Sequence, residues 1–286
     1  MGALFLYLCV MDKTPIDCCA GTKLMMLGTG SAFPVRSYNS CFAVRKGSSL
    51  LLVDTGGGNG ILSVLGRAGI DGGDIHHLFI THVHTDHILG SVWVIRTVIN
   101  RWKENLYEDK LNIYGNSDVL ETIDALCRMT LLGSHYEIFK RITRFIDVSK
   151  DTRPKCGFNI NFFDVGSQNV VQTGFVLAMH DEKRFVFLGD ESLTERNASY
   201  AESADYLMCG AFCRYADKDI FKPYEKHHHT VRDVAELAER CDVKNLILVH
   251  CEDNNLSSRA FLYEQEASEC YSGRLIVPVD NQIIVL

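Results

Sequence analysis

The stretch Thr81-His82-Val83-His84-Thr85-Asp86-His87 follows an apolar run and places four metal-ligand side chains within seven residues. His82 and His84 alternate as on the end of an extended strand, so both imidazoles can point the same way. Asp86 and His87 follow on a tight turn, which aims them at a neighbouring point. Two histidines for one cation, with a carboxylate and a histidine for a second, are typical of a dinuclear hydrolytic site. A polar loop of hydrogen-bonded histidines is the alternative, and the density of ligands argues against it.

This stretch resembles the His-x-His-x-Asp-His signature of the metallo-β-lactamase superfamily, and other segments extend the resemblance along nearly the whole chain. They match, in order, a first strand with its glycine loop, a strand ending in an aspartate, a segment carrying a bridging carboxylate and a strand delivering the last histidine. These segments are residues 23–34, 52–58, 187–190 and 248–250. Residues 27–34 and the His-His-Thr at 228–230 look closest to the ribonuclease Z-like branch.

The resemblance implies an α/β fold, the αββα sandwich, in which two mixed β-sheets pack together and helices cover them on the outside. The patterning agrees, because short apolar strands alternate with amphipathic segments. We expect strands over residues 24–27, 40–45, 50–53, 77–80, 111–114, 159–164, 174–179, 184–188, 206–209 and 246–250. We expect helices over residues 60–68, 88–102, 117–132 and 231–240, capped at Asn116 or Ser117 and at Thr230.

The length and composition predict one large domain. A chain of 286 residues with 47% hydrophobic residues can bury a single large core. We therefore expect residues 23–286 to form one hydrolase-like domain and residues 1–22 to be an extension of unassigned role. Residues 2–11 are almost wholly apolar, but a membrane span needs about 20 such residues. No basic residue precedes this run, as one would in a signal peptide.

Charge and cysteine content bound the partners and the compartment. The chain carries 29 basic and 36 acidic residues, and this net charge of −7 argues against a broad nucleic-acid interface. Its eleven cysteines show no regular spacing, which is typical of a reduced protein and not of a disulfide framework. We expect a cytoplasmic protein without membrane attachment, and the sequence leaves open whether it forms a homodimer.

By resemblance, six residues hold two cations. The expected ligands are His82 and His84 on metal one, Asp86, His87 and His250 on metal two, and Asp190 as the bridge between them. Imidazole and carboxylate groups suit divalent metals. Zn²⁺ is the expected cofactor, at one or two ions per chain, with Mn²⁺ and Fe²⁺ as alternatives. Asp54 is expected to orient a ligand without binding a metal, although an aspartate at a strand end can equally be a turn former.

The resemblance also implies catalytic and substrate-binding residues. Asp86 and His228 are the expected catalytic residues, and His229 and Thr230 are expected to bind substrate at the start of the helix over 231–240. A histidine beside the free N–H groups of a helix start suits a phosphate or a developing oxyanion. Three solvated histidines before a helix cap are the alternative.

Two glycines depart from the family pattern. Gly166 matches the position of a further histidine ligand, 24 residues before Asp190, so metal one is expected to lack a ligand. Gly210 stands where ribonuclease Z-like proteins carry a glutamate that orients the catalytic histidine. We expect both departures to reduce activity.

The expected function is metal-dependent hydrolysis of a small phosphodiester, with a metal-bound hydroxide as the nucleophile. Ribonuclease Z grips transfer RNA with a long arm inserted before the bridging aspartate, and the residues between Gly166 and Asp190 leave no room for such an arm. Two alternatives stay open. The first is a degenerate protein of the same fold that binds a metal or ligand with little turnover, and the second is a hydrolase of another ester, amide or thioester.

Overall fold

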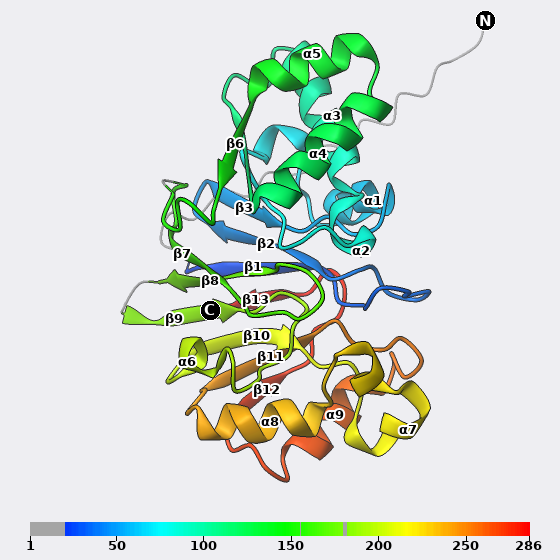
Figure 1. The fold of residues 1–286 in the computed structure, drawn as a ribbon, viewed down its shortest axis with the longest axis vertical. Helices are drawn as coiled ribbons and strands as arrows, with labels where there is room; N and C mark the ends of the chain where they lie inside the picture. The colour runs from blue at the N-terminus through cyan, green and yellow to red at the C-terminus, as the bar shows by residue number, and fades with distance from the viewer. Residues whose placement is uncertain (1–20, 155, 180–181) are drawn as a thin grey trace, which may run out of the picture.

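The computed structural model describes residues 21–154, 156–179 and 182–286. Two β-sheets face each other, and helices cover both outer faces (Figure 1). The αββα sandwich expected from the sequence is therefore confirmed. Most of the expected extension, residues 1–20, lies outside the described residues.

The first sheet has seven strands in the order β13-β1-β2-β3-β4-β5-β6. They are β1 (Lys23–Gly28), β2 (Cys41–Lys46), β3 (Ser49–Val53), β4 (His77–Phe79), β5 (Leu111–Gly115), β6 (Thr143–Asp147) and β13 (Ile283–Val285). From β3 to β6 the strands run parallel. Because parallel strands end at the same edge of a sheet, Asp54 after β3 meets the histidine loop after β4.

The second sheet has six strands in the order β12-β11-β10-β9-β8-β7. They are β7 (Asn159–Asp164), β8 (Thr173–Ala178), β9 (Arg184–Phe187), β10 (Tyr206–Gly210), β11 (Asn245–Val249) and β12 (Arg274–Ile276). Strands β9 to β12 are parallel, and this brings Asp190 after β9 and His250 after β11 to one edge.

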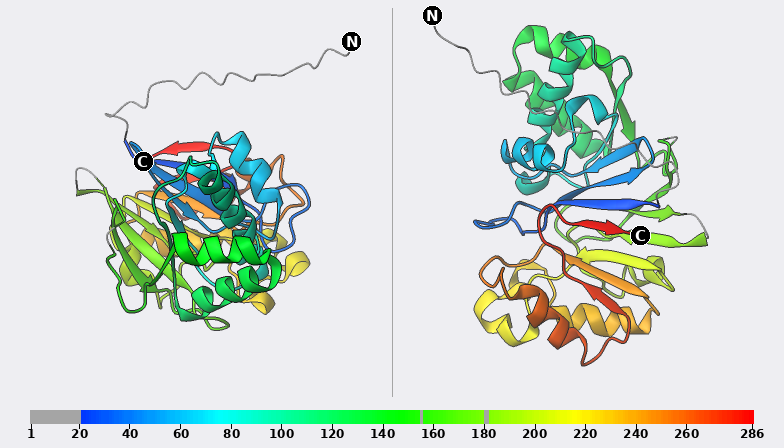
Figure 2. Two further views of the ribbon diagram at one scale, coloured as in Figure 1. Left: turned by 90° about the horizontal axis from the view of Figure 1, so that it is seen from above. Right: turned by 180° about the vertical axis from the view of Figure 1, so that it is seen from behind.

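Helices form the two outer layers, which the right-hand view of Figure 2 shows on opposite sides of the sheets. The first sheet is covered by α1 (Gly60–Arg67), α3 (Ser91–Lys103), α4 (Ser117–Thr130) and α5 (Gly133–Ile142). The second is covered by α8 (Val231–Arg240) and α9 (Arg259–Ala267). The short helices are α2 (Thr85–Ile88), α6 (Ala198–Ala201) and α7 (Lys218–Phe221). No helix within the described part of the chain is long and apolar enough to span a membrane.

An aromatic core joins the two sheets. Alternate residues of β2 show how it forms, since Phe42 and Val44 point to the second sheet whereas Cys41 and Ala43 point to the helices. The rings of Phe42 and Phe187 meet edge to face with centroids 4.9 Å apart. Both faces of the first sheet are thus buried, which explains the almost continuously apolar strands.

Two features of the fold differ from expectation. The helix expected over 88–102 begins at Ser91, because Ile88 belongs to α2 and Gly90 packs against the segment after β3, where a Cβ would lie 2.0 Å from the carbonyl oxygen of Thr55. Eight elements were not expected, namely the helices α2, α5, α6, α7 and α9 and the strands β6, β12 and β13. The edge strand β6 is half exposed, and β12 and β13 have three residues each, so their apolar patterns are weak.

Candidate metal centre

The loop after β4 places the four signature side chains at the edge of the first sheet. His84 has an extended backbone (φ −63°, ψ 149°) and precedes α2, and its carbonyl accepts the N–H of His87 at 3.1 Å. His82 and His84 therefore lie before the helix, whereas Asp86 and His87 lie on its first turn. The side chains of His82, Asp86 and His87 are buried, and that of His84 is exposed.

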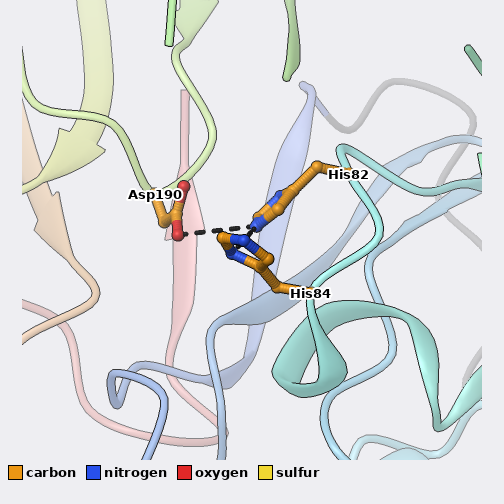
Figure 3. A group of neighbouring side chains, drawn as sticks. All are labelled: His82, His84 and Asp190. Atoms are coloured by element: carbon orange, nitrogen blue, oxygen red, sulfur yellow. Dashed lines mark hydrogen bonds and ion pairs between the residues drawn. The ribbon is translucent and has the colours of Figure 1, made fainter. Parts of the chain in front are cut away.

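Asp190 and His250 reach the same point from the second sheet. Oδ2 of Asp190 lies 3.7 Å from Nε2 of His82, 3.6 Å from Nε2 of His87 and 3.7 Å from Nε2 of His250. Figure 3 shows this carboxylate facing the rings of His82 and His84. One carboxylate oxygen is therefore shared by imidazoles from both sheets.

The six side chains form two groups, in each of which the ligand atoms lie within 4.8 Å of one another. The groups are His82, His84 and Asp190, and Asp86, His87 and His250. In the first, Nε2 of His82 is 2.9 Å from Nδ1 of His84. In the second, Oδ2 of Asp86 is 3.2 Å from Nε2 of His87 and 3.6 Å from Nε2 of His250. Tetrahedral ligands about 2.1 Å from zinc are about 3.4 Å apart, so these separations suit one cation per group.

Two buried imidazole nitrogen atoms indicate whether cations fit the two ligand groups. Nε2 of His87 and Nε2 of His250 are buried and have no hydrogen-bond partner among the described residues. Buried polar atoms are normally paired, and both of these face the carboxylates of Asp86 and Asp190. Buried carboxylates also need a counter-charge. The residues present therefore fit a pair of divalent cations held by imidazole and carboxylate groups.

Asp54 contacts the imidazole of His87 through the ring nitrogen that does not face Asp190. Its Oδ2 lies 2.8 Å from Nδ1 of His87, and its Oδ1 accepts the backbone N–H of Thr81 at 2.8 Å. This contact directs the N–H of Nδ1 to Asp54 and leaves Nε2 of His87 for the site. The structure thus places Asp54 behind a candidate ligand, in the position expected for an orienting residue.

Burial sets the charge state of His82. Desolvation lowers the pKa of His82 to about 3, even though Asp190 opposes the shift. The imidazole is therefore neutral near pH 7, which is the form that binds metals.

His228 borders the same site. Its ring lies 4.9 Å from that of His250 between centroids and stacks on Phe212 at 5.3 Å and 12°. Burial, together with the neighbouring His250, lowers the pKa of His228 to about 4. His228 and five of the six candidate ligands line one cavity of about 500 Å³. A neutral His228 therefore faces whatever occupies that cavity.

His229 and Thr230, which were expected to bind substrate, do not line the cavity of the candidate ligands. Thr230 is fully buried, and its hydroxyl bonds to Asp233 in a capping box at the start of α8. His229 lines a neighbouring cavity of about 550 Å³ and not the one that holds the candidate ligands. The capping box expected at Thr230 is confirmed, and it occupies the hydroxyl of Thr230.

Gly166 does not occupy the position expected of it. It is exposed and left-handed (φ 76°), and a Cβ there would approach only Arg196. Gln172 of this loop contacts the candidate ligands, since its Nε2 lies 3.0 Å from Nδ1 of His82 and donates to Oδ1 of Asp190. Gln172 directly precedes β8, in which Thr173 pairs with Asp164 of β7. The spacing of residues along the chain does not show how β7 and β8 pair.

Gly210 packs against the backbone of Asp190. It ends β10, and a Cβ there would lie 2.0 Å from the carbonyl oxygen of Asp190. Its N–H donates to the carbonyl of Glu191 at 2.9 Å. The backbone of β10 therefore supports the backbone that carries Asp190.

We expect Gly210→Ala to shift Asp190, to destabilise the fold by about 1–3 kcal/mol through overpacking, and to lower bound metal. Thermal unfolding and metal content per chain measure both effects. Gly66→Ala is the matched control, because Gly66 lies on the exposed side of α1 with nothing within 4 Å of a Cβ. Unchanged metal content in Gly210→Ala would show that β10 can move without Asp190.

The loop over residues 33–37 is held by hydrogen bonds to Asp253, and these contacts were not expected from the sequence. The carboxylate of Asp253 accepts the backbone N–H groups of Val35 at 2.7 Å, Arg36 at 2.5 Å and Ser37 at 3.1 Å. Phe33, at the tip of this loop, is 92% exposed and lines the cavity. These partners lie more than 200 residues apart, and no local motif announces them.

Comparisons with known proteins agree with this geometry. The family model described as anti-Pycsar protein Apyc1 matches residues 22–268. Ribonuclease Z of Halorubrum lacusprofundi is 25% identical over 307 residues, covering 92% of this chain and 96% of that protein. The metallo-β-lactamase fold protein YhfI from Bacillus subtilis has a TM-score of 0.74 at 20% identity, covering 92% and 99% of the two chains. Human tRNase Z, short form, has a TM-score of 0.69 at 21% identity, covering 92% and 98%.

The resemblance to ribonuclease Z-like proteins of the metallo-β-lactamase superfamily is thus confirmed along the chain. Together with the two ligand groups, these relatives support a metal-dependent hydrolase. Because the family model extends over well more than half of its residues, the chain belongs to the family of the anti-Pycsar protein Apyc1.

Proposed function

We propose that the chain hydrolyses small phosphodiesters with two divalent cations, Zn²⁺ in the simplest case and Mn²⁺ or Fe²⁺ as alternatives. The observation that carries this proposal is the position of Asp190, whose Oδ2 lies 3.6–3.7 Å from three imidazoles of two ligand groups. A carboxylate shared in this way is typical of dinuclear hydrolases.

The chain's own residues divide the work. His82, His84 and Asp190 would hold one cation, and Asp86, His87 and His250 would hold the other together with Asp190. Two such ions supply Lewis acidity that activates water and neutralises charge on a phosphate. Asp54 keeps His87 oriented through Nδ1. Asp86 also lines the cavity, where its carboxylate orients the attacking water.

His228 contacts the substrate in this proposal. Its imidazole is neutral near pH 7, because burial lowers its pKa to about 4, and it stands over the cavity on the ring of Phe212. A neutral imidazole offers one N–H, which donates to a phosphoryl oxygen as negative charge develops there. The capped start of α8 contributes less, since Thr230 already accepts the N–H of Asp233.

The size of the site supports a small substrate. The cavity measures about 500 Å³, in the range of small-molecule sites. Only residues 165–172 connect β7 to β8, and only residues 179–183 connect β8 to β9. The segment before Asp190 is therefore occupied by strands and short connections, which supports the absence of an arm for transfer RNA.

We also place the chain in the cytoplasm and treat residues 23–286 as one domain. Every described cysteine is a free thiol, and all but Cys270 are buried, which supports a reducing compartment. The aromatic core shared by the two sheets supports the single domain.

A substrate comparison tests the function. With Zn²⁺ or Mn²⁺ added, we expect turnover of bis-p-nitrophenyl phosphate that EDTA abolishes, and no turnover of a chromogenic β-lactam or thioester. Transfer RNA should bind weakly, with affinity falling about 10³-fold or more between 50 and 200 mM salt if six or more phosphates are contacted. Tight binding of transfer RNA that tolerates salt would refute the small-substrate proposal. Metal binding without any turnover would favour a degenerate protein instead.

A further inference from the structure

Gln172 is a buried amide at the metal centre that no sequence motif marked. Its side chain is 1% exposed, and its Nε2 donates to Oδ1 of Asp190. The same atom lies 3.0 Å from Nδ1 of His82. Its Oε1 is buried without a hydrogen-bond partner among the described residues. Gln172 therefore touches both a candidate ligand of one cation and the carboxylate shared by two.

The surrounding backbone is built to hold this amide. Thr173 donates its N–H to the carbonyl of Thr81 at 3.0 Å, which ties Gln172 to the loop that carries His82. Gly189 precedes Asp190 with φ 72°, and a Cβ there would lie 2.9 Å from Cδ of Gln172. Only a glycine at 189 leaves room for the amide beside Asp190.

Hydrogen-bond roles assign Asp190 as the main partner of Gln172. The hydroxyl of Thr81 donates to Oδ2 of Asp54 at 2.9 Å, so its oxygen is free to accept the Nδ1–H of His82, also at 2.9 Å. That tautomer leaves Nε2 of His82 unprotonated and directed to the site. With Nδ1 of His82 acting as a donor, the N–H groups of Gln172 are left for Oδ1 of Asp190.

We propose that Gln172 is a positioning residue that holds Oδ1 of Asp190, so that Oδ2 alone serves both cations. The two oxygens have separate surroundings, because Oδ1 receives the amide whereas Oδ2 faces the imidazoles of His82, His87 and His250. Without the amide, the carboxylate could rotate and offer its oxygens unequally to the two groups. This role rests on the proposed dinuclear function and concerns how the second cation is retained.

Gln172→Glu tests the role with almost no change in shape, because it replaces the donor with a carboxylate that repels Asp190. We expect the second cation to bind about 10–100-fold more weakly, as for other residues that orient metal ligands. Zn²⁺ titration against a competing chelator and metal content per chain measure this effect. The visible spectrum at one and two equivalents of Co²⁺ reports which group has changed.

Two further variants keep the test decisive. Gln168→Glu is the matched control, because Gln168 lies on the same loop, is exposed, and faces Arg196. It should bind two cations as the unmodified chain does. Gln172→Met removes the donor without adding a charge, so it gives the answer if the glutamate variant does not fold, and it should also weaken the second cation.

The outcomes separate this inference from the proposed function. Metal affinity that is unchanged or higher in Gln172→Glu would overturn the positioning role, because a glutamate that binds better would make residue 172 a ligand. Two tightly bound cations without phosphodiester turnover would refute the proposed function, while the affinities would still decide the role of Gln172. A chain that binds no second cation would overturn both.

Discussion

Replacing Asp190 with alanine is expected to remove most bound metal and to reduce phosphodiester turnover by about 10³-fold or more, as expected when several kcal/mol of metal-derived stabilisation is lost. Oδ2 of Asp190 faces imidazoles of both ligand groups at 3.6–3.7 Å, so one substitution weakens both cation sites. Metal content per chain and the rate with bis-p-nitrophenyl phosphate measure the two effects.

The control for Asp190 is Asp164→Ala. Asp164 is an exposed carboxylate at the end of β7 in the same sheet, and its removal should leave metal content and turnover within about twofold, as for surface substitutions generally. If Asp190→Ala kept two cations per chain, the shared carboxylate would not be the bridge.

Replacing His228 with alanine should reduce turnover by about 10²–10³-fold, the usual cost of losing one donor to a developing oxyanion. Metal content should stay unchanged, because His228 belongs to neither ligand group and stacks on Phe212 beside His250. The rate constant kcat should fall more than KM rises, since the contact strengthens as charge develops.

His135→Ala is the matched control for His228, because His135 lies on α5 on the outer side of the first sheet. Its turnover should equal that of the unmodified chain. A His228→Ala variant that loses metal would make His228 a ligand or a support of one. Unchanged turnover with full metal content would remove His228 from the mechanism.

Local patterns predicted the parts of this protein that depend on neighbours in the chain. The spacing of His82, His84, Asp86 and His87 already contains the geometry of a strand end followed by a helical turn. Asn116 and Thr230 cap their helices as expected, because capping joins residues three positions apart. The four helices and ten strands that apolar periodicity predicted lie close to the positions expected for them.

The errors fell where distant segments decide a side chain's direction. Gly166 and Gln172 lie on one loop, and spacing favoured the wrong residue of the two. Gln172 lies just before β8, and its amide contacts Asp190 and His82, which are contacts between distant segments that spacing along the chain does not show. The expected role of Gly210 was incomplete for a related reason, since its contact with Asp190 joins two strands that periodicity cannot align.

Residue types and short-range spacing were sufficient to predict the superfamily, the fold class and the residues of the two candidate ligand groups. The folded chain was needed to show that Oδ2 of Asp190 lies near imidazoles of both ligand groups, that Gln172 donates to Oδ1 of Asp190, and that Asp253 bonds to the loop next to Phe33. These contacts join residues from 18 to more than 200 positions apart. Such contacts form when the sheets pack together, so the physical reason for the division is the range of the interactions.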